Sequence, residues 1–370
     1  MSLAPTTRLL SSKAQLQQSR IDRRAEPPLE DGEAMLALDR VALTTNNITY
    51  AVFGEAMQYW QFFPTGEPGW GQMPVWGFAN VVASRSPGIE VGERYYGYYP
   101  LASQLRMRPE RNSQRGFYDG TPHRAALVSA YNQYTRCTTD PSYEARFEDH
   151  QALLRPLLIT AFFAADFLID NDLFGARRVL VSSASSKTAY GTAYCLRRMR
   201  DVELVALTSA SNRRFVEELG CYQRVVGYDA LETLERDVPT VYLDYSGDIT
   251  LRGRVHEQLG AALVYDCVAG SAQNADPSHL QAPAGVGPAP KLYFAPTQIK
   301  KRTLEWGHDE VNKRVADAQR AFILRVADPE RPWLNVVEHA GLDAAAALIV
   351  DFVRGRVDPR AGHIISMSRG

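Results

Sequence analysis

Hydrophobic and polar residues alternate over much of the first hundred positions. Residues 33–63 combine this alternation with few helix-forming residues, and residues 74–99 continue it around turns at 87–88 and 91–93. We therefore predict strands in both stretches and a β-rich N-terminal domain. Residues 101–150 are polar and mixed, with no clean period, whereas 143–170 has the pattern of a helix.

From Arg178 onward the pattern changes to short apolar runs that alternate with helical stretches. Strands are predicted at 179–183, 203–208, 223–227, 240–245, 261–268 and 291–295, and helices at 187–200, 211–220, 229–236 and 250–259. This rhythm predicts a doubly wound parallel sheet. Two more helices, 306–328 and 342–354, precede a last apolar strand at 363–367 that can return to the first domain. The Pro-, Gly- and Ala-rich segment 271–290 is expected to be a surface loop.

A chain of 370 residues is long for one core, so we expect two domains. The predicted boundaries are 1–150, completed by 305–370, and 151–304. The net charge of −1 gives no sign of a nucleic acid or membrane partner. The apolar run 153–169 contains Arg155, Pro156 and Asp166, and therefore indicates a buried helix rather than a membrane span.

The number and spacing of the cysteines and histidines bear on the compartment of the protein and on whether it binds zinc. The four cysteines form no CxxC pair, which indicates free thiols in a reducing compartment, and the N-terminus has no apolar signal core. We therefore predict a cytoplasmic protein. Seven scattered histidines without a paired spacing argue against a zinc site, so no metal ligands are assigned.

The strand, turn and helix from Arg178 to Arg200 form the strongest candidate site. Small side chains let such a turn close tightly and let a phosphate approach the backbone, while the free amides and dipole of the helix start favour an anion. The alternative is a serine-rich cap before an ordinary helix. The candidate phosphate-binding residues are Ser183, Ala184, Ser185, Ser186, Lys187 and Thr188.

A nucleoside triphosphate site is a weaker interpretation of the same turn. Ser186-Lys187-Thr188 imitates the end of a P-loop, but that motif needs glycine where Val181 and Ser186 stand. The missing glycines argue against ATP hydrolysis.

The end of the second strand of this sheet indicates which dinucleotide would bind. NAD sites place a carboxylate there for the ribose 2′-hydroxyl, whereas this strand is followed by Thr208, Ser209, Asn212 and Arg213. Hydroxyls and an arginine fork suit a 2′-phosphate, which favours NADPH over NADH. The alternative is a polar helix start with solvated arginines.

Later strand ends supply further candidates. Asp244, Ser246, Gly247 and Gly270 follow the fourth and fifth strands, at the edge where ligands bind in doubly wound sheets. Their alternative role is turn formation.

The element order and several motifs resemble the medium-chain dehydrogenase/reductase superfamily. Residues 74–82 and 91–95 are similar to its barrel strands, 178–191 to its first βα turn, and 221–228 and 244–247 to later strand ends. The strings SSASSKTA and KLYFAPTQIKKRTLEWG resemble an uncharacterised branch that is known only as a domain of unknown function. The resemblance implies a GroES-like β-barrel domain plus a Rossmann domain.

The resemblance also implies roles for single residues. Residues 46–50 are similar to the segment that places an asparagine near substrate and nicotinamide, so Asn47 is a candidate to fix a carbonyl oxygen and Tyr50 to donate a proton. The equal alternative is that Asn47 makes a turn hydrogen bond and Tyr50 packs in the barrel. Tyr228 falls where NADPH-dependent members place a tyrosine against the 2′-phosphate. The fifth and sixth sheet strands could pair across a homodimer.

Departures from the superfamily pattern are informative. Phe78-Ala79 replaces the His-Glu pair of the barrel, and no cysteine stands near Tyr50, so a zinc-independent protein is expected. The motif glycines are replaced by Ser183, Ser186 and Ala189.

The predicted function is an NADPH-dependent oxidoreductase that transfers hydride to an enone, a quinone or a similar polarised carbonyl acceptor, with a small-molecule substrate. One alternative is a catalytically inactive NADPH-binding sensor or interaction protein. A weaker one is a ketone or alcohol dehydrogenase that uses Tyr50 and Lys300, which is expected in a basic turn with Lys301 and Arg302.

Overall fold

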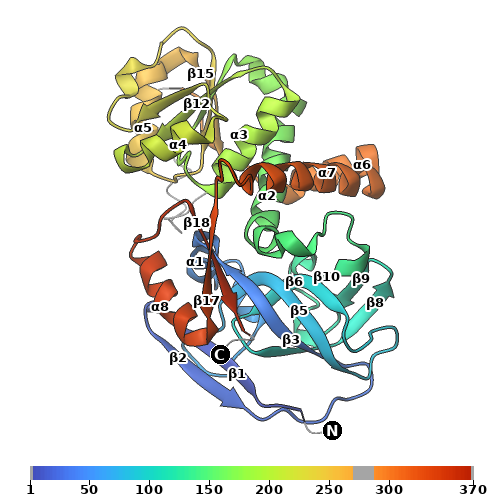
Figure 1. Ribbon diagram of the computed structural model, residues 1–370. Helices are drawn as coiled ribbons and strands as arrows, with labels where there is room; N and C mark the ends of the chain where they lie inside the picture. The colour runs from blue at the N-terminus through green and yellow to red at the C-terminus, as the bar shows by residue number, and fades with distance from the viewer. Residues whose placement is uncertain (1–2, 270–286, 368–370) are drawn as a thin grey trace. The chain divides into compact units, whose positions relative to one another are not determined.

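The computed structural model describes residues 3–269 and 287–367, which form two compact units (Figure 1). The first unit contains the described residues up to Leu153 together with those from Leu334 onward, and the second contains 154–333. Two units agree with the expectation from chain length. The return to the first unit begins at 334 rather than at 305, because the helical residues 305–333 belong to the second unit.

The first unit is built around a nine-stranded sheet. Its strand order is β17-β18-β3-β5-β6-β10-β9-β8, and β7 also pairs with β3. The C-terminal strand pairs antiparallel with β3, which confirms the expected return of that strand. The strands are β3 (Ala34–Leu43), β5 (Pro74–Ser84), β6 (Arg94–Pro100), β7 (Gln104–Met107), β8 (Pro109–Ser113), β9 (Gly116–Asp119), β10 (Gln133–Arg136), β17 (Asn335–Ala340) and β18 (Ala361–Ser366).

Helix α8 (Gly341–Val353) closes the core of this unit. Its Leu348 and Ile349 pack in one apolar cluster with Leu36 of β3 and Val75 of β5. Short 3-10 helices link the later strands; they are η2 (Pro122–Arg124), η3 (Ser129–Asn132), η4 (Cys137–Thr139) and η5 (Ala145–Phe147). The polar segment 101–150 thus contributes four strands and three short helices, η2, η3 and η4, that its sequence did not predict, whereas η5 lies within the predicted helix 143–170.

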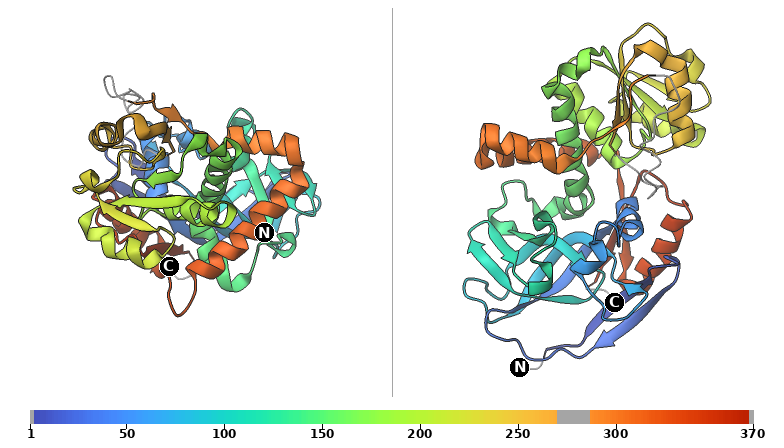
Figure 2. Two further views of the ribbon diagram at one scale, coloured as in Figure 1. Left: turned by 90° about the horizontal axis from the view of Figure 1, so that it is seen from above. Right: turned by 180° about the vertical axis from the view of Figure 1, so that it is seen from behind.

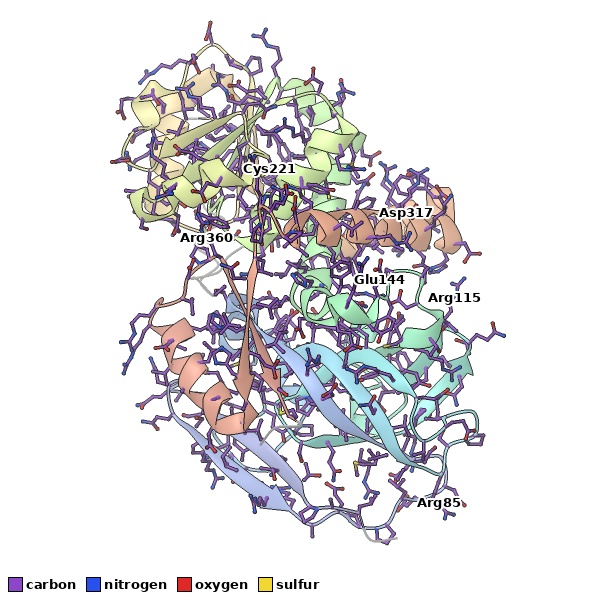
Figure 3. All side chains as sticks on the ribbon, in the orientation of Figure 1. Arg85, Arg115, Glu144, Cys221, Asp317 and Arg360 are labelled. Carbon is purple, nitrogen blue, oxygen red and sulfur yellow. The ribbon has the colours of Figure 1, made fainter. Side chains whose placement is uncertain are left out.

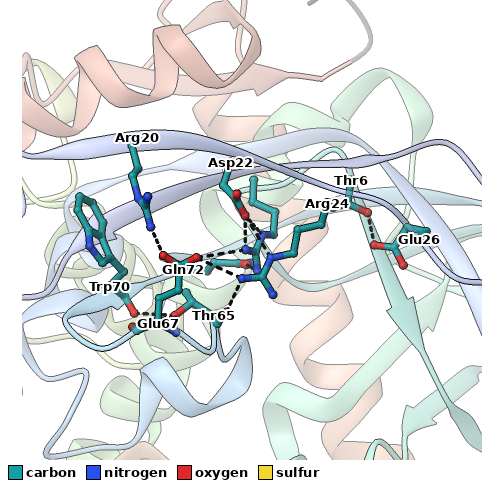
Figure 4. Close-up of polar contacts among 10 residues, drawn as sticks. Thr6, Arg20, Asp22, Arg24, Glu26, Thr65, Glu67, Trp70 and Gln72 are labelled. Carbon is teal, nitrogen blue, oxygen red and sulfur yellow. Dashed lines mark hydrogen bonds and ion pairs between the residues drawn. The ribbon is translucent and has the colours of Figure 1, made fainter.

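A small sheet of β2-β1-β4 precedes the main one and was not predicted either. Its strands are β1 (Thr6–Ser12), β2 (Ser19–Arg24) and β4 (Trp70–Gly71). Polar contacts hold it. Arg8 Nε donates to Asp22 Oδ2 (3.0 Å). Figure 4 shows Arg24, whose Nη2 donates to the Thr65 carbonyl (2.9 Å). Strand β2 has only Ile21 as a large apolar residue, so no hydrophobic pattern marks it.

The prediction of strands over 33–63 is wrong for residues 45–52 and 59–62. They form helix α1 (Thr45–Val52) and the 3-10 helix η1 (Tyr59–Phe62). The reason is local: Asn47 Oδ1 accepts from the Thr44 amide (2.7 Å) and from its hydroxyl (3.0 Å), which closes a cap at the helix start. This cap outweighs the strand preference of the β-branched and aromatic residues in the segment.

Helix α2 (Glu148–Asp170) matches the predicted helix. The stretch Ala145–Asp170 is long and apolar enough to cross a membrane by length and composition. However, 61% of its most apolar window is buried inside the structure, as in the core helix of a globular protein. The burial supports the interpretation from sequence.

The second unit contains the predicted parallel sheet, with order β13-β12-β11-β14-β15-β16. This is the 3-2-1-4-5-6 order of a Rossmann sheet and confirms the predicted fold class. Its strands are β11 (Arg178–Val181), β12 (Glu203–Thr208), β13 (Arg224–Gly227), β14 (Thr240–Asp244), β15 (Leu263–Val268) and β16 (Lys291–Leu292).

Helices cover both faces of this sheet. Figure 2 shows α2 and α3 (Lys187–Met199) on one side and α5 (Ile249–Leu259) on the other, where Leu251 and Val255 pack against Leu180 and Val205. The remaining helices are α4 (Arg213–Leu219), α6 (Ala295–Trp306), α7 (His308–Val326), η6 (Asp172–Gly175), η7 (Ala210–Asn212), η8 (Leu231–Thr233) and η9 (Gly260–Ala262).

Two predictions about the helices of this unit need correction. The stretch 229–236 holds only the short helix η8, and 306–328 is preceded by a separate helix, α6. Gly307, at φ +82°, separates α6 from α7. Lys301 and Arg302 therefore lie in a helix rather than in a basic turn, and both pair with Asp170 of α2.

All four cysteines are buried and free of disulfides, as expected. Cys137 belongs to the first unit, and Cys195, Cys221 and Cys267 belong to the second. Figure 3 labels Cys221. Burial raises the pKa of the Cys195 and Cys221 thiols to about 12, so both stay protonated at neutral pH.

Candidate functional site: the carboxyl edge of the parallel sheet

Strand β11 lies at the centre of the parallel sheet, between β12 and β14. The chain winds in one direction from β11 to β13 and in the other from β14 onward, so the topological switch point lies between β11 and β14. Residues 182–186 leave β11 at this point and lead into α3. Open α/β sheets bind ligands there, outside the carboxyl ends of the strands.

The turn after β11 has a conformation that is unusual for its sequence. Ser183 adopts φ +49°, the left-handed region that favours glycine. The Ser183 carbonyl accepts from the Ser186 amide (2.8 Å), and the Ser183 amide donates to the Tyr228 hydroxyl (3.1 Å). A strained non-glycine residue costs on the order of 1 kcal/mol and is held only where its surroundings fix it.

Helix α3 begins directly after this turn. Ser186 is its N-cap, and the Ser186 hydroxyl accepts from the Ala189 amide (3.3 Å). Lys187 and Thr188 are the first two helical residues, in the turn whose amides point out of the helix start. Both side chains are half-buried. The helix start thus combines the amides of the first turn, a positive dipole end and a lysine, which together suit an anion.

The turn is tied to the end of β12. Asn212 Nδ2 donates to the Ser185 hydroxyl (3.1 Å), while the Thr208 carbonyl accepts from the Tyr228 amide (3.0 Å). The Thr208 side chain is only 1% exposed, and its hydroxyl has no hydrogen-bond partner among the described residues. Ser209 shares a 2.9 Å hydrogen bond with Ser211. This edge therefore carries hydroxyl and amide groups.

Arg213 opens helix α4 beside β13. A Cβ atom at Gly227 would lie 2.9 Å from Arg213 Nη2 and 2.3 Å from Asp229 Oδ1. The glycine therefore makes room for the guanidinium close to the backbone of β13. Sequence reasoning passed over Gly227, although a glycine at the end of a strand is a recognised sign of close approach.

The end of β14 is organised by a single buried carboxylate. Asp244 is fully buried, and its Oδ1 accepts from the Ser182 hydroxyl (2.7 Å), the Ser246 amide (2.8 Å) and the Gly247 amide (3.2 Å). The Ser182 hydroxyl in turn accepts from the Tyr245 amide (3.0 Å). Asp244 and Ser182 thus join the ends of β14 and β11.

The structure brings most of the predicted residues of the second unit to one edge. Hydrogen bonds connect Ser183 with Tyr228, Ser185 with Asn212, and Ser246 with Asp244. Gly270 lies outside the described residues. The edge therefore presents one connected set of polar groups drawn from four strand ends.

Asn47 and Tyr50 belong to the first unit, on helix α1. Asn47 is 2% exposed; beyond the cap at Thr44, its Nδ2 donates to the Pro74 carbonyl (2.8 Å). The Tyr50 hydroxyl accepts from Trp76 Nε1 (3.2 Å) within a cluster of aromatic side chains. Burial raises the pKa of Tyr50 to about 12, so it stays protonated at neutral pH. Both side chains have the structural contacts that the alternative interpretation described.

No group of three or more His, Cys, Asp or Glu side chains within 3–269 and 287–367 is arranged to hold a metal ion. Phe78 and Ala79, which replace the ligand pair of the zinc enzymes, are fully buried in β5.

The chain is similar to several solved structures over almost its whole length. CurA from Vibrio vulnificus, in complex with NADPH, matches with a TM-score of 0.60 at 11% identity, covering 98% of this chain and 99% of that one. A protein from Sinorhizobium meliloti 1021 bound to NADP matches with a TM-score of 0.55 at 12% identity, covering 99% and 100%. The quinone oxidoreductase from Coxiella burnetii gives 0.52 at 10% identity, covering 98% and 100%.

At this level of identity the matches concern the fold alone, and they agree with the predicted arrangement of a β-rich domain and a Rossmann domain. No curated protein matches the sequence. The family model of DUF2855, described as a protein of unknown function, matches residues 41–358. That match covers most of the chain and agrees with the predicted branch, so the chain belongs to the DUF2855 family.

Proposed function

We propose that this chain is an NADPH-dependent oxidoreductase that acts on a small molecule. The observation that carries the proposal is the connected polar edge of the Rossmann sheet, where the strained turn at Ser183 leads into the start of α3. Two structures of the same fold, from Vibrio vulnificus and Sinorhizobium meliloti, hold NADPH and NADP, and this supports the same cofactor class here.

The turn and helix start would hold the pyrophosphate. Residues 183–188 supply small side chains, hydroxyls and the backbone amides of the helix start, and Lys187 adds a positive charge. A helix N-terminus with these groups needs no further cation to attract a phosphate. This assignment covers Ser183, Ala184, Ser185, Ser186, Lys187 and Thr188.

The end of β12 would select NADPH over NADH. No carboxylate follows this strand, and the half-buried Arg213 offers a planar fork of donors for a 2′-phosphate. Ser209 and Asn212, which follow the same strand, and Tyr228, which follows β13, would supply further hydrogen-bonding groups. The buried Thr208 hydroxyl, which lacks a partner among the described residues, would gain one from the cofactor.

NADPH would supply the hydride, and the protein would orient the acceptor and exclude water. An enone, a quinone or a similar polarised carbonyl compound fits this chemistry, because such acceptors need at most one proton donor. Tyr50 is our candidate donor, since its raised pKa keeps the hydroxyl protonated. Asn47 is the candidate to fix a carbonyl oxygen. Phe78 and Ala79 in place of the ligand pair support a zinc-independent reaction.

A second candidate function is an NADPH-binding sensor without catalysis. The contacts of Asn47 favour it, because this side chain already bonds Thr44 and Pro74 and would have to release them to bind a substrate. Four buried cysteines that form no disulfide support a reducing, cytoplasmic location for either function. A homodimer through the fifth and sixth strands of the sheet stays a prediction.

Calorimetric titration of the purified protein with NADPH and NADH tests the proposal. We expect NADPH to bind more tightly, Lys187→Ala to weaken both nucleotides, and Arg213→Ala to weaken NADPH by about tenfold while sparing NADH. Arg214→Ala is the matched control, because this neighbouring side chain is 89% exposed and pairs with Glu218. It should change neither affinity.

Absence of nucleotide binding by the wild-type protein would contradict the cofactor assignment. If NADPH binds, turnover with a panel of enones and quinones separates the two functions. Consumption of NADPH identifies a reductase, whereas binding without consumption supports the sensor.

A further inference from the structure

A set of buried charged side chains lies behind the carboxyl edge of the parallel sheet. Its members are Asp244, Arg252, Asp266 and His256, and each is at most 1% exposed. The Arg252 guanidinium bonds Asp244 Oδ2 and lies 3.5 Å from Asp266 Oδ2. His256 Nε2 lies 2.8 Å from the same Asp266 oxygen. The four side chains therefore form one continuous network.

The fold explains why these residues meet. Arg252 and His256 are four positions apart on α5, so they point from one face of that helix. Tyr242 of β14 is in register with Asp266 of β15, and Asp244 lies two residues after Tyr242. Because side chains alternate along a strand, Asp244 and Asp266 project from the same face of the sheet, which α5 covers.

The two oxygens of Asp244 have different partners. Oδ2 bonds Arg252, whereas Oδ1 accepts from Ser182, Ser246 and Gly247. The first of these residues starts the turn after β11, and the other two form the turn after β14. One carboxylate thus connects the network behind the sheet with both turns at the switch point.

An unpaired carboxylate would be costly here. Removing a charge from water is unfavourable unless it is paired and hydrogen-bonded, and an uncompensated negative charge beside an anion-binding turn would also repel a phosphate. Arg252 meets both requirements, because it neutralises Asp244 and fixes its orientation. Asp266 lies on the other side of the guanidinium, and His256 contacts Asp266 in turn.

We propose that Arg252 is a positioning residue: it holds Asp244 so that the turns after β11 and β14 have the geometry needed to bind the cofactor. The cofactor part of this inference rests on the proposed function. The ordering of the two turns does not, so the two parts can be tested separately.

Three variants isolate this role. Arg252→Gln removes the positive charge and leaves Asp244 uncompensated, while the double variant Asp244→Asn/Arg252→Gln removes both charges and keeps hydrogen-bonding groups. Arg178→Gln is the matched control. Arg178 is 2% exposed and bonds Glu203 (2.8 Å) and Glu235 (2.6 Å), but it begins β11 at the opposite end from the site.

The first measurement is amide hydrogen exchange of the cofactor-free protein. In Arg252→Gln we expect the amides of Tyr245, Ser246 and Gly247 to exchange at least about tenfold faster, and the double variant to restore most of the protection. Arg178→Gln should leave these amides unchanged. Unchanged exchange in Arg252→Gln, or equal acceleration in the control, would overturn the proposal.

The second measurement is NADPH affinity by calorimetry. Arg252→Gln should weaken binding by about tenfold or more, with substantial recovery in the double variant and no change in Arg178→Gln. If the wild-type protein binds no NADPH, the proposed function fails while the exchange result still decides the positioning role. If Arg252→Gln does not fold, Arg252→Lys takes its place. Lysine keeps the positive charge but lacks the planar set of guanidinium donors, so Arg252→Lys should accelerate exchange at the same amides.

Discussion

The two candidate regions of this chain use polar side chains in opposite ways. On helix α1 of the first unit, Asn47 bonds Thr44 and Pro74 and is 2% exposed. At the carboxyl edge of the second unit, the carboxylate of Asp244 and the hydroxyl of Ser182 are also bonded within the protein, but their bonds hold the turns at the switch point of the sheet, where open α/β sheets bind ligands. Polar residues alone therefore do not mark a binding site; what matters is which part of the fold their bonds hold in place.

The largest expected effect concerns a purely structural network in the first unit. Arg124 is 1% exposed, bonds Asp119 and Tyr134, and lies over the rings of Phe62 and Phe63. Arg124→Met leaves Asp119 buried without its partner, so we expect this unit to lose about 3–5 kcal/mol of stability. Denaturant unfolding measures the loss. NADPH affinity should not change, and a selective loss of binding in a folded variant would contradict the comparison.

Asn47→Ala tests the structural role of the polar side chains on α1 of the first unit. The variant loses the helix cap and leaves the Pro74 carbonyl without its donor, which should cost about 2 kcal/mol. Thermal unfolding checks this figure. Thr45→Ala is a control at an exposed position of α1, and the Thr45 side chain takes part in neither of these bonds. Full stability combined with lost turnover would instead show that Asn47 acts in catalysis.

Alkaline pH probes the buried tyrosines of the first unit. Burial raises the pKa of Tyr50 and of Tyr134 to about 12, above the ordinary value of 10. A raised pKa in the folded state favours the protonated form, so its contribution to stability is complete below pH 10 and is lost as the pH rises from 10 towards 12.

Unfolding temperatures measured across this range should therefore fall, and Tyr50→Phe should flatten part of the decline. If Tyr50 is the proton donor, it stays protonated between pH 6 and about 9, so turnover should show no tyrosine titration in this range. A rate that follows a tyrosine titration near neutral pH would contradict this assignment.

The smallest expected effect concerns the turn at Ser183. Ser183→Gly relieves the left-handed backbone conformation and should stabilise the second unit by about 0.5–1 kcal/mol, with NADPH binding retained. Ser186→Gly is the contrasting variant, since Ser186 has φ −74° and caps α3. It should cost a few tenths of a kcal/mol, roughly the value of the lost cap. Equal responses of the two variants would show that strain is not localised at Ser183.

The sequence predicted the Rossmann unit well because its strands are buried on both faces. Such strands are nearly continuous apolar runs, as in Val179–Val181 and Leu204–Leu207, and their ends are marked by small polar residues. Because these runs locate the strand ends, the turn before Lys187 and the missing carboxylate after β12 could also be recognised in the sequence.

The first unit was harder to predict because its decisive interactions are local or between side chains. Strand β2 is held by ion pairs rather than by an apolar face, and α1 is set by the bond between Thr44 and Asn47. The link from Arg252 through Asp244 to Ser182 was missed for a further reason. It joins residues 70 positions apart, and no spacing rule within one element connects them.

The burial of the four thiols has a practical consequence for following this protein in solution. A thiol must ionise and meet its reagent to be alkylated, so the folded chain should resist modification until a unit opens. Alkylation of Cys137 would then time the opening of one unit, and alkylation of Cys195, Cys221 and Cys267 the opening of the other. Mass spectrometry of labelled peptides would thus measure the opening rates of both units in one sample. A ligand of the Rossmann unit should slow only the alkylation of Cys195, Cys221 and Cys267.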